Sequence, residues 1–333
     1  MTGSGVFHGG GIDAAAARYG RPVEEWLDLS TGINPCAPPL PDIPASVWQR
    51  LPDSDLIAAA RHTAARYYGS GAILPIAAGG TQMLIRALAN RADVNRRIAV
   101  LAPTYGEYQQ VFADSGFAVD FVSVADAISP AHGLAVIVNP NNPDGRVFSR
   151  DELLRLCERL SETGTILVVD EAFADLEPAL SMARATERFS NLVVLRSFGK
   201  FFGYAGLRLA FAISGDEHGP AIERILGPWP VSGPALVIAD ALMRQDHEQL
   251  RLTIRERRAA LETVLEEAGF PVIGGTDLFA LIGCQDARAV FEHLAGEGIL
   301  TRAFDYRPDW LRVGLFARDE DGLRLLSALK AFG

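Results

Sequence analysis

Apolar and polar positions alternate along the chain on two different length scales. Between about residues 55 and 215, short and wholly apolar runs alternate with longer segments whose apolar positions follow the helical period. Runs such as residues 166–169 and 192–195, rich in β-branched side chains, are typical of buried parallel strands. Their alternation with helical segments predicts an α/β domain with a doubly wound, mostly parallel sheet.

Proline-rich interruptions of this pattern predict the domain boundaries. A proline-rich stretch follows an N-terminal arm, residues 1–40, and leads into a large domain, residues 41–230. The sequence Pro-Trp-Pro at residues 228–230 breaks the pattern again. Proline interrupts helices and central strands alike, so a small C-terminal domain is expected over residues 231–333.

Polar groups directly follow the two apolar runs. Asp170 closes the first predicted strand, and Ser197 to Lys200 follow the second, at the sheet edge where open α/β folds bind ligands. A lysine in desolvating aromatic surroundings loses its proton readily enough to form an imine. Ser197 and Arg208 could hold a phosphate, and Asp170 could keep a pyridine nitrogen protonated. The group predicts a site for pyridoxal 5'-phosphate (PLP), although singly Asp170 could be a cap and Lys200 a solvated loop residue.

Three upstream segments supply further candidate groups. Gly79, Gly80 and Thr81 follow an apolar run and open a helical pattern, which places bare amides and a hydroxyl at a helix N-terminus suited to phosphate. Tyr105, just after another apolar run, could stack on a pyridine ring. Asn142 lies in a turn after a third run and could donate to the ring phenolate oxygen. Taken alone, each is more typical of an ordinary turn or a core tyrosine.

These motifs together resemble the fold-type-I aminotransferase superfamily over nearly the whole chain. They are Gly80-Thr81, Tyr105, the run from Asn139 to Gly145, Asp170-Glu171-Ala172-Phe173, the run from Ser197 to Lys200, Arg208 and Arg312. The resemblance implies a PLP cofactor and a homodimer with sites at its interface. It also implies a large domain with a mostly parallel doubly wound sheet and a smaller α+β domain formed by the C-terminal part and the N-terminal arm.

Within this superfamily, the segments from His8 to Gly11 and from Leu27 to Pro35 are similar to those of the threonine-phosphate decarboxylases of cobalamin biosynthesis, relatives of histidinol-phosphate aminotransferases. The resemblance implies decarboxylation of L-threonine O-3-phosphate to (R)-1-amino-2-propanol O-2-phosphate. The expected substrate-binding residues are His8, Gly9, Gly10, Asn34, Arg302 and Arg312. The two arginines could instead form structural ion pairs with Asp305 or Asp309.

Two positions depart from the pattern of the superfamily. Leu51 stands where many relatives have a tyrosine that reaches the cofactor phosphate of the neighbouring subunit, and Phe173 replaces a tyrosine that donates to the ring phenolate oxygen. Asn142 would then be the remaining side-chain donor to that oxygen.

Two other functions share this scaffold. One is a histidinol-phosphate or related aminotransferase, and the other is a non-catalytic PLP-binding or regulatory protein. The latter would be expected to lack the lysine or to carry an added DNA-binding domain. Lys200 is present and the N-terminal arm is too short for a helix-turn-helix domain.

Composition narrows the functional classes. With 333 residues, of which 49% are hydrophobic, the chain can bury a sizeable core, and its net charge of −10 argues against a nucleic-acid surface. Three widely spaced cysteines suggest neither a disulfide framework nor a zinc cluster, and the histidines show no metal-ligand spacing. No signal peptide or membrane span is evident, so a cytoplasmic enzyme acting on a small phosphorylated amino acid is expected.

Overall fold

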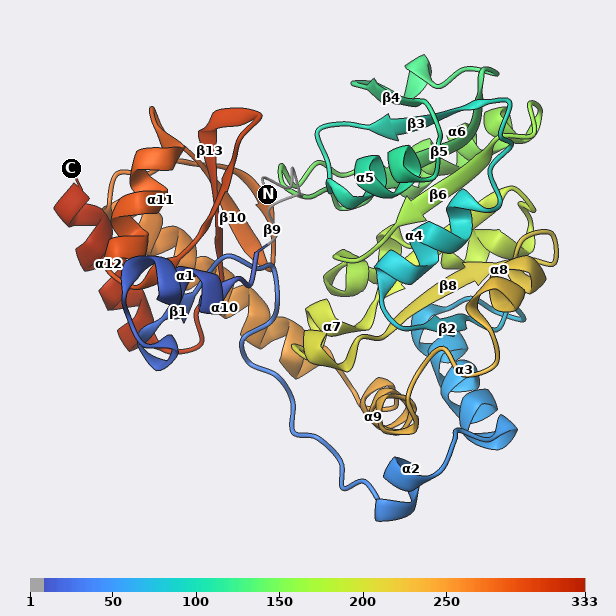
Figure 1. The fold of residues 1–333 in the computed structure, drawn as a ribbon, viewed down its shortest axis with the longest axis horizontal. Helices are drawn as coiled ribbons and strands as arrows, with labels where there is room; N and C mark the ends of the chain where they lie inside the picture. Colours follow the sequence, from blue (N-terminus) through green and yellow to red (C-terminus); the bar gives the residue numbers. More distant parts are fainter. Residues whose placement is uncertain (1–8, 333) are drawn as a thin grey trace. The chain divides into compact units, whose positions relative to one another are not determined.

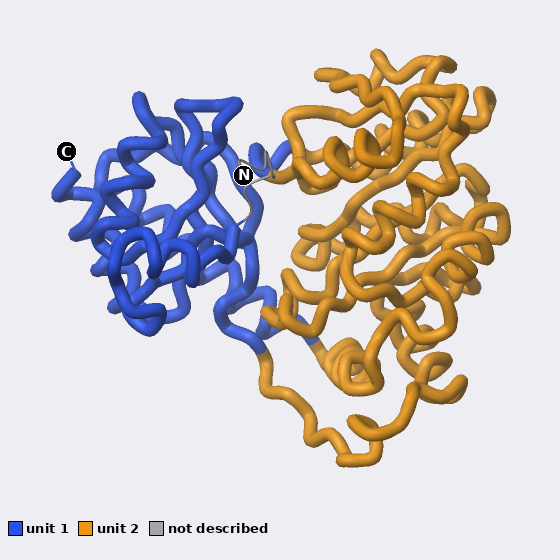
Figure 2. The backbone as a smooth tube through the Cα atoms, in the orientation of Figure 1, with its two compact units in different colours: residues 1–37, 143–146, 247–333 blue, residues 38–142, 147–246 orange. Residues whose placement is uncertain are grey.

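The chain folds into two compact units. The computed structural model describes residues 9–332. The smaller unit contains the chain up to Ala37, residues 143–146 and the chain from His247 onward, and the larger contains Pro38–Asn142 and Val147–Asp246 (Figure 2). The N-terminal arm and the C-terminal part thus belong to one unit, as the resemblance implied. The unit boundary lies after Asp246.

The larger unit is built on a mixed sheet. Among the described residues its seven strands are β2 (Ile76–Ala78), β3 (Arg97–Leu101), β4 (Val119–Val122), β5 (His132–Val138), β6 (Ile166–Asp170), β7 (Leu192–Ser197) and β8 (Ala210–Ser214). Their order is β2-β8-β7-β6-β5-β3-β4, and only β8 pairs antiparallel with its neighbours (Figure 1). The predicted strands at 166–169 and 192–195 are therefore confirmed as neighbouring parallel strands in the middle of the sheet.

Helices alternate with these strands as predicted. They are α2 (Ala45–Gln49), α3 (Ser54–Tyr68), α4 (Thr81–Ala89), α5 (Glu107–Asp114), α6 (Arg150–Ser161), α7 (Phe198–Phe201), α8 (Gly219–Leu226) and α9 (Gly233–Met243). Local chemistry fixes several of their ends. The carboxylate of Asp53 accepts from the Leu56 amide to begin α3, and Ser149 and Glu152 form a capping box at the start of α6.

The core of the larger unit lies on both faces of its sheet, because successive side chains of each strand point to opposite faces. Ile166 and Val168 of β6 and their neighbours on the adjoining strands pack against the apolar faces of α4, α5 and α8. Because successive side chains of a strand point to opposite faces, Asp170 is expected on the same face as Ile166 and Val168. Glu171, the next residue, is directed to the opposite face.

The smaller unit contains a second sheet and its own helices. Its elements are α1 (Ile12–Tyr19), β1 (Leu27–Asp28), α10 (Glu248–Glu267), β9 (Val272–Thr276), β10 (Phe279–Gly283), α11 (Ala287–Gly296), β11 (Ile299–Leu300), β12 (Arg302–Phe304), β13 (Arg307–Gly314) and α12 (Asp319–Phe332). Strands β12, β13, β10 and β9 form an antiparallel sheet in that order, and β1 of the N-terminal arm pairs with β11. None of the helices in residues 9–332 is both long and apolar enough to cross a bilayer.

A buried ionic network joins β7 to the segment that follows β6. The guanidinium of Arg196 lies 2.6 Å from a carboxylate oxygen of Glu171 and 3.0 Å from one of Asp175, and all three side chains are at most 3% exposed. The Ser181 hydroxyl and the Met182 amide also donate to Glu171. This network supplies hydrogen bonds and counter-charge that buried carboxylates require.

Arg196→Met is expected to lower the free energy of unfolding by about 3–5 kcal/mol. Methionine fills much of the space but leaves the carboxylates of Glu171 and Asp175 buried without their cation, and removing one partner of a buried ion pair has about this cost. Urea denaturation of the apoprotein, followed by circular dichroism, measures the change.

Arg188→Met is the matched control. Arg188 pairs with Glu158 at the surface, where their side chains are 68% and 62% exposed. Its loss should cost no more than about 1 kcal/mol. Equal effects of the two substitutions would contradict the proposed contribution of the buried network.

Candidate functional site

The register of β8 brings three candidate phosphate ligands to one edge of the larger unit's sheet. Ala210, at the start of β8, pairs with Ser197 at the end of β7 and with Ala78 at the end of β2. Arg208 lies two residues before β8 begins, and the Gly79–Gly80 turn immediately follows β2. Since β8 alone runs antiparallel, its beginning lies at the same edge as the ends of the other strands. Ser197, Arg208 and the turn therefore converge there.

Gly80 and Arg208 lie in direct contact. A Cβ placed on Gly80 would lie 2.7 Å from Nη2 of Arg208, and Gly80 has φ +97°, a conformation that other residues rarely adopt. Arg208 itself has φ 51° and ψ 53°, a left-handed conformation unusual for a residue with a side chain. Thr81 follows as the first residue of α4, so the guanidinium lies beside a helix N-terminus. This arrangement could bind a phosphate through a charged fork and backbone amides.

Asp170 is a buried carboxylate at the end of β6, 3% exposed. Its Oδ2 accepts from the Tyr108 hydroxyl at 2.7 Å and its Oδ1 from the Ala172 amide at 3.0 Å. Burial raises the pKa of Asp170 to about 6, opposed by these two donors and by the charge of Lys200. At neutral pH the carboxyl group is thus mostly ionised and can accept from a cationic ring nitrogen.

Lys200 lies in the short helix α7, among buried aromatic side chains. Phe198 and Phe201 beside it in the sequence are each 1% exposed. Its Nζ is 5.9 Å from the ring centroid of Phe173. The lysine therefore has the aromatic surroundings expected for it, and Phe173 lies near its amine.

A buried asparagine connects the loops that carry Tyr105 and Asn142. The side chain of Asn141 donates to the Pro103 carbonyl at 2.8 Å and accepts from the Thr104 hydroxyl at 2.6 Å. Asn141 is fully buried. It fixes the loop before Tyr105 against the turn that contains Asn142, although it was not among the residues predicted from the sequence.

Arg302 and Arg312 are directly opposite each other in the smaller unit. They are partners in the register of β12 and β13, and Arg312 is 7% exposed. Burial and the charge of Arg302 lower the pKa of Arg312 to about 10. Like charges directly across a sheet are unfavourable, so this arrangement is suited to an anion. Asp309, a predicted structural partner, pairs instead with Arg307 at 2.7 Å.

The glycines of the N-terminal arm approach the same strand region. The Gly10 amide donates to the Ser30 hydroxyl at 2.7 Å, and a Cβ on Gly9 would lie 2.4 Å from the Ser30 carbonyl oxygen. That carbonyl accepts from Nη2 of Arg312 at 2.6 Å. Asn34, 2% exposed, accepts from the Cys36 amide in a local turn. His8 lies outside the described residues.

Tyr108 is the clearest site residue that sequence reasoning missed. It lies in the first turn of α5, whereas Tyr105 precedes that helix. A tyrosine among the apolar positions of α5 needs a partner for its hydroxyl, and this was the available signal. The sequence could not identify Asp170 as that partner.

The sequence comparisons give consistent matches. Residues 39–329 match the family model for aminotransferase class I and II. A threonine-phosphate decarboxylase from Sinorhizobium sp is 50% identical over 324 residues, covering 97% of both chains. A threonine-phosphate decarboxylase from Pseudomonas aeruginosa is 42% identical over 331 residues, covering 98% of this chain and 97% of the relative.

Solved structures share the fold at low sequence identity. Histidinol-phosphate aminotransferase from Sinorhizobium meliloti, in complex with pyridoxal-5'-phosphate, has a TM-score of 0.81 at 19% identity and covers 99% of this chain and 95% of that one. L-Threonine-O-3-phosphate decarboxylase from Porphyromonas gingivalis has a TM-score of 0.76 at 21% identity and covers 91% and 98% of the two chains.

The groups in the larger unit fit PLP. The turn at Gly80 and the guanidinium of Arg208 together form a phosphate cradle that matches the phosphate of PLP. A Cβ on Gly80 would displace this guanidinium. The buried, ionised Asp170 suits a protonated pyridine nitrogen, and Lys200 suits the aldehyde. Three polar parts of the cofactor, namely its phosphate, ring nitrogen and aldehyde, thus have chemically matching residues, and these residues follow strand ends along one edge of the sheet.

Gly80→Ala should weaken PLP binding at least about tenfold. The new methyl group would collide with the Arg208 guanidinium, and a displaced charge-assisted phosphate contact removes about 1.5–3 kcal/mol of binding free energy. Titration of the apoprotein with PLP, monitored by absorbance, measures the affinity.

Gly69→Ala is the control for backbone strain. Gly69 also has a positive φ, +67°, but nothing lies within 4 Å of its added Cβ. Its substitution should reduce stability and leave PLP affinity unchanged. An unchanged affinity in Gly80→Ala would show that the cradle does not bind the phosphate.

Proposed function

This chain belongs to the aminotransferase class I and II family, and we propose that it is a PLP-dependent decarboxylase that converts L-threonine O-3-phosphate to (R)-1-amino-2-propanol O-2-phosphate in cobalamin biosynthesis. The observation that carries the reaction is the 50% and 42% identity to threonine-phosphate decarboxylases over nearly the whole chain. Both matches cover 97–98% of this chain and 97% of the relatives, so they extend over both of the units that carry the residues proposed for the site.

The residues of the larger unit hold the cofactor in this proposal. Lys200 would attach it covalently, Arg208, Ser197 and residues 79–81 would bind its phosphate, and Tyr105 would contact its ring. Asn142 would donate to the phenolate oxygen. When bound, PLP supplies an electron sink for the negative charge that develops at the substrate Cα. Asp170 serves that sink because a buried carboxylate favours the protonated ring nitrogen.

The smaller unit's arginines recognise the substrate's two anionic groups. Arg302 and Arg312 are cross-strand partners, and the substrate carries a phosphate and a carboxylate. In decarboxylation the carboxylate leaves as carbon dioxide and a proton replaces it at Cα. His8, Gly9, Gly10 and Asn34 join the arginines in orienting the substrate. Such orientation selects which Cα bond breaks and can lower the barrier by several kcal/mol, up to about 7–11 kcal/mol when the geometry is near ideal.

The enzyme is also proposed to be a homodimer. Trp48, Leu51 and Trp229 are 66%, 66% and 54% exposed. Trp48 lies in α2, which packs on α9, and Trp229 lines a cavity of about 590 Å³ together with Ile57 of α3 and Leu236 of α9. Large exposed apolar side chains gathered near a cavity are typical of an interaction surface. Covering it by a second copy would remove them from water.

The state of the three cysteines is consistent with the proposed cytoplasmic location. Cys36, Cys157 and Cys284 are all free, and burial raises the pKa of Cys157 to about 12, which leaves this thiol unreactive. Free cysteines are usual where the environment is reducing.

Purified holoenzyme should release carbon dioxide from L-threonine O-3-phosphate. Unphosphorylated threonine should have a kcat/KM lower by about a hundredfold or more, because two charge-assisted contacts to the phosphate are lost. Isotopic carbon dioxide release and chromatography of the amine product measure both reactions, and Lys200→Ala serves as the inactive control.

The competing activity is tested on the same preparation. Conversion of histidinol phosphate with 2-oxoglutarate, without carbon dioxide release from threonine phosphate, would replace the decarboxylase assignment with the aminotransferase. Comparable kcat/KM values for threonine and its phosphate would remove the proposed role of the phosphate in orientation.

Light scattering should give twice the chain mass of 35.9 kDa. The double substitution Trp48→Arg and Trp229→Arg places charges on the proposed interface and should shift the protein towards monomer. Val94→Arg, at a side chain 81% exposed on a turn of the same unit, should leave the dimer intact. A wild-type monomer at micromolar concentration would disprove the assembly.

A further inference from the structure

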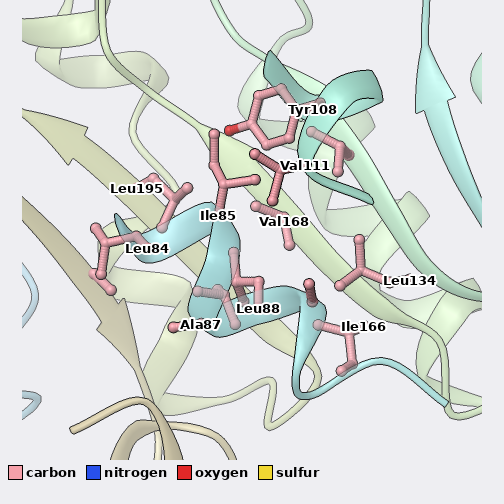
Figure 3. Packing of buried hydrophobic residues seen from close by; sticks show 14 of the residues in the cluster. Leu84, Ile85, Ala87, Leu88, Tyr108, Val111, Leu134, Ile166, Val168 and Leu195 are labelled. Carbon is pink, nitrogen blue, oxygen red and sulfur yellow. The ribbon is translucent and has the colours of Figure 1, made fainter. Parts of the chain in front are cut away.

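Tyr108 is a tyrosine placed wholly inside an apolar core. It is fully buried, in the first turn of α5, and belongs to the core cluster between α4, α5 and the sheet. Figure 3 shows its ring beside Val111 and Ile85. A phenylalanine would satisfy this apolar packing equally well, so the hydroxyl group requires a separate explanation.

That hydroxyl donates to Oδ2 of Asp170 at 2.7 Å, and both groups are buried. Asp170 and Tyr108 are 62 residues apart in the sequence. Because successive side chains of β6 point to opposite faces of the sheet, the Asp170 side chain lies on the face covered by α5. This explains why it contacts the Tyr108 hydroxyl. The Ala172 amide binds the other oxygen, Oδ1. The carboxylate is therefore fixed at both oxygens by donors from two different elements.

Tyr108 also lies beside other groups of the site. Its ring is perpendicular to that of Tyr105, with the centroids 6.2 Å apart. Glu107, the preceding residue, accepts from the side chain of Gln82, which follows Thr81 in the first turn of α4. The first turn of α5 thus contacts Asp170, Tyr105 and the beginning of α4.

We propose that Tyr108 is a positioning residue that keeps Asp170 charged and oriented towards the cofactor's ring nitrogen. The proposal rests on the proposed PLP-dependent function, because it assigns Asp170 to the ring. Tyr108 does not touch the reacting atoms and acts only through the carboxylate.

The direction of the effect follows from the groups around Asp170. A hydrogen bond from a neutral hydroxyl favours the charged carboxylate, as does the nearby charge of Lys200, whereas burial and the charge of Glu171 oppose it. Burial and the neighbouring carboxylate hold the pKa of Tyr108 well above its usual range, so the hydroxyl remains a donor. Without this donor, a proton shared between the ring nitrogen and Asp170 shifts towards the carboxylate.

Tyr108→Phe tests the proposal in the holoenzyme. The protein is reconstituted with PLP carrying a heavy-isotope label at the ring nitrogen, and nitrogen NMR reports whether that atom is protonated. We expect the resonance to move towards the unprotonated position at constant pH. Activity should fall about tenfold to a hundredfold in kcat, the loss expected for a hydrogen bond to a charged group.

Tyr67→Phe is the matched control. The Tyr67 hydroxyl donates to the carboxylate of Asp175 at 2.8 Å in the same unit, so its removal also takes one hydroxyl from a largely buried aspartate. It should reduce stability without moving the ring-nitrogen resonance. Equal movement in both variants, or none in Tyr108→Phe, would overturn the proposal.

A second substitution covers the case in which Tyr108→Phe does not fold. Site-specific replacement of Tyr108 by 3-fluorotyrosine keeps the shape and makes the hydroxyl a stronger donor. The resonance should then move towards the protonated position, and an unchanged resonance would refute the role of Tyr108. Neither readout depends on the substrate. A wild-type protein that binds PLP, shows these shifts and releases no carbon dioxide would disprove the decarboxylase function alone.

Discussion

A carboxylate stays ionised inside a protein only where donors and cations surround it, and this requirement governs the end of β6. Asp170 and Glu171 are consecutive, so strand alternation sends them to opposite faces of the sheet. Each meets a different set of partners: Tyr108 and the Ala172 amide hold the first, and Arg196 the second. A one-residue slip of β6 would exchange the two carboxylates and leave both without suitable partners. The requirement therefore fixes the register as well as the chemistry.

The single antiparallel strand of the larger unit has a comparable effect on phosphate chemistry. In a wholly parallel sheet, a segment preceding a strand lies at the opposite edge from a segment following one. Reversal of β8 brings Arg208 beside Gly80, and the left-handed conformation of Arg208 makes the final turn into the strand. Such a conformation costs a non-glycine residue roughly 1–2 kcal/mol. Global packing of the sheet supplies that free energy.

Much of the larger unit followed from its sequence because buried strands have a simple apolar pattern. The strands ending at Asp170 and Ser197 were predicted, as was their common edge. Partners distant in sequence were not predictable: nothing in the pattern connected Tyr108 with Asp170 or showed that Arg302 and Arg312 share a register. Domain boundaries were also difficult, since the proline breaks give no indication that α9 packs on α3 in the larger unit.

Each unit contains two of the four tryptophans, and the two pairs differ in their exposure to solvent. Trp26 and Trp310 of the smaller unit are 9% and 8% exposed, and Trp48 and Trp229 of the larger are 66% and 54% exposed. Indole emission shifts to longer wavelength in water, so each pair has its own part of the fluorescence spectrum. In the single chain, blue emission follows the integrity of the smaller unit, and red emission, with its sensitivity to aqueous quenchers, follows the surface of the larger. In the proposed dimer, where a second copy covers Trp48 and Trp229, the red emission moves to shorter wavelength and loses that sensitivity, so one label-free spectrum also follows assembly.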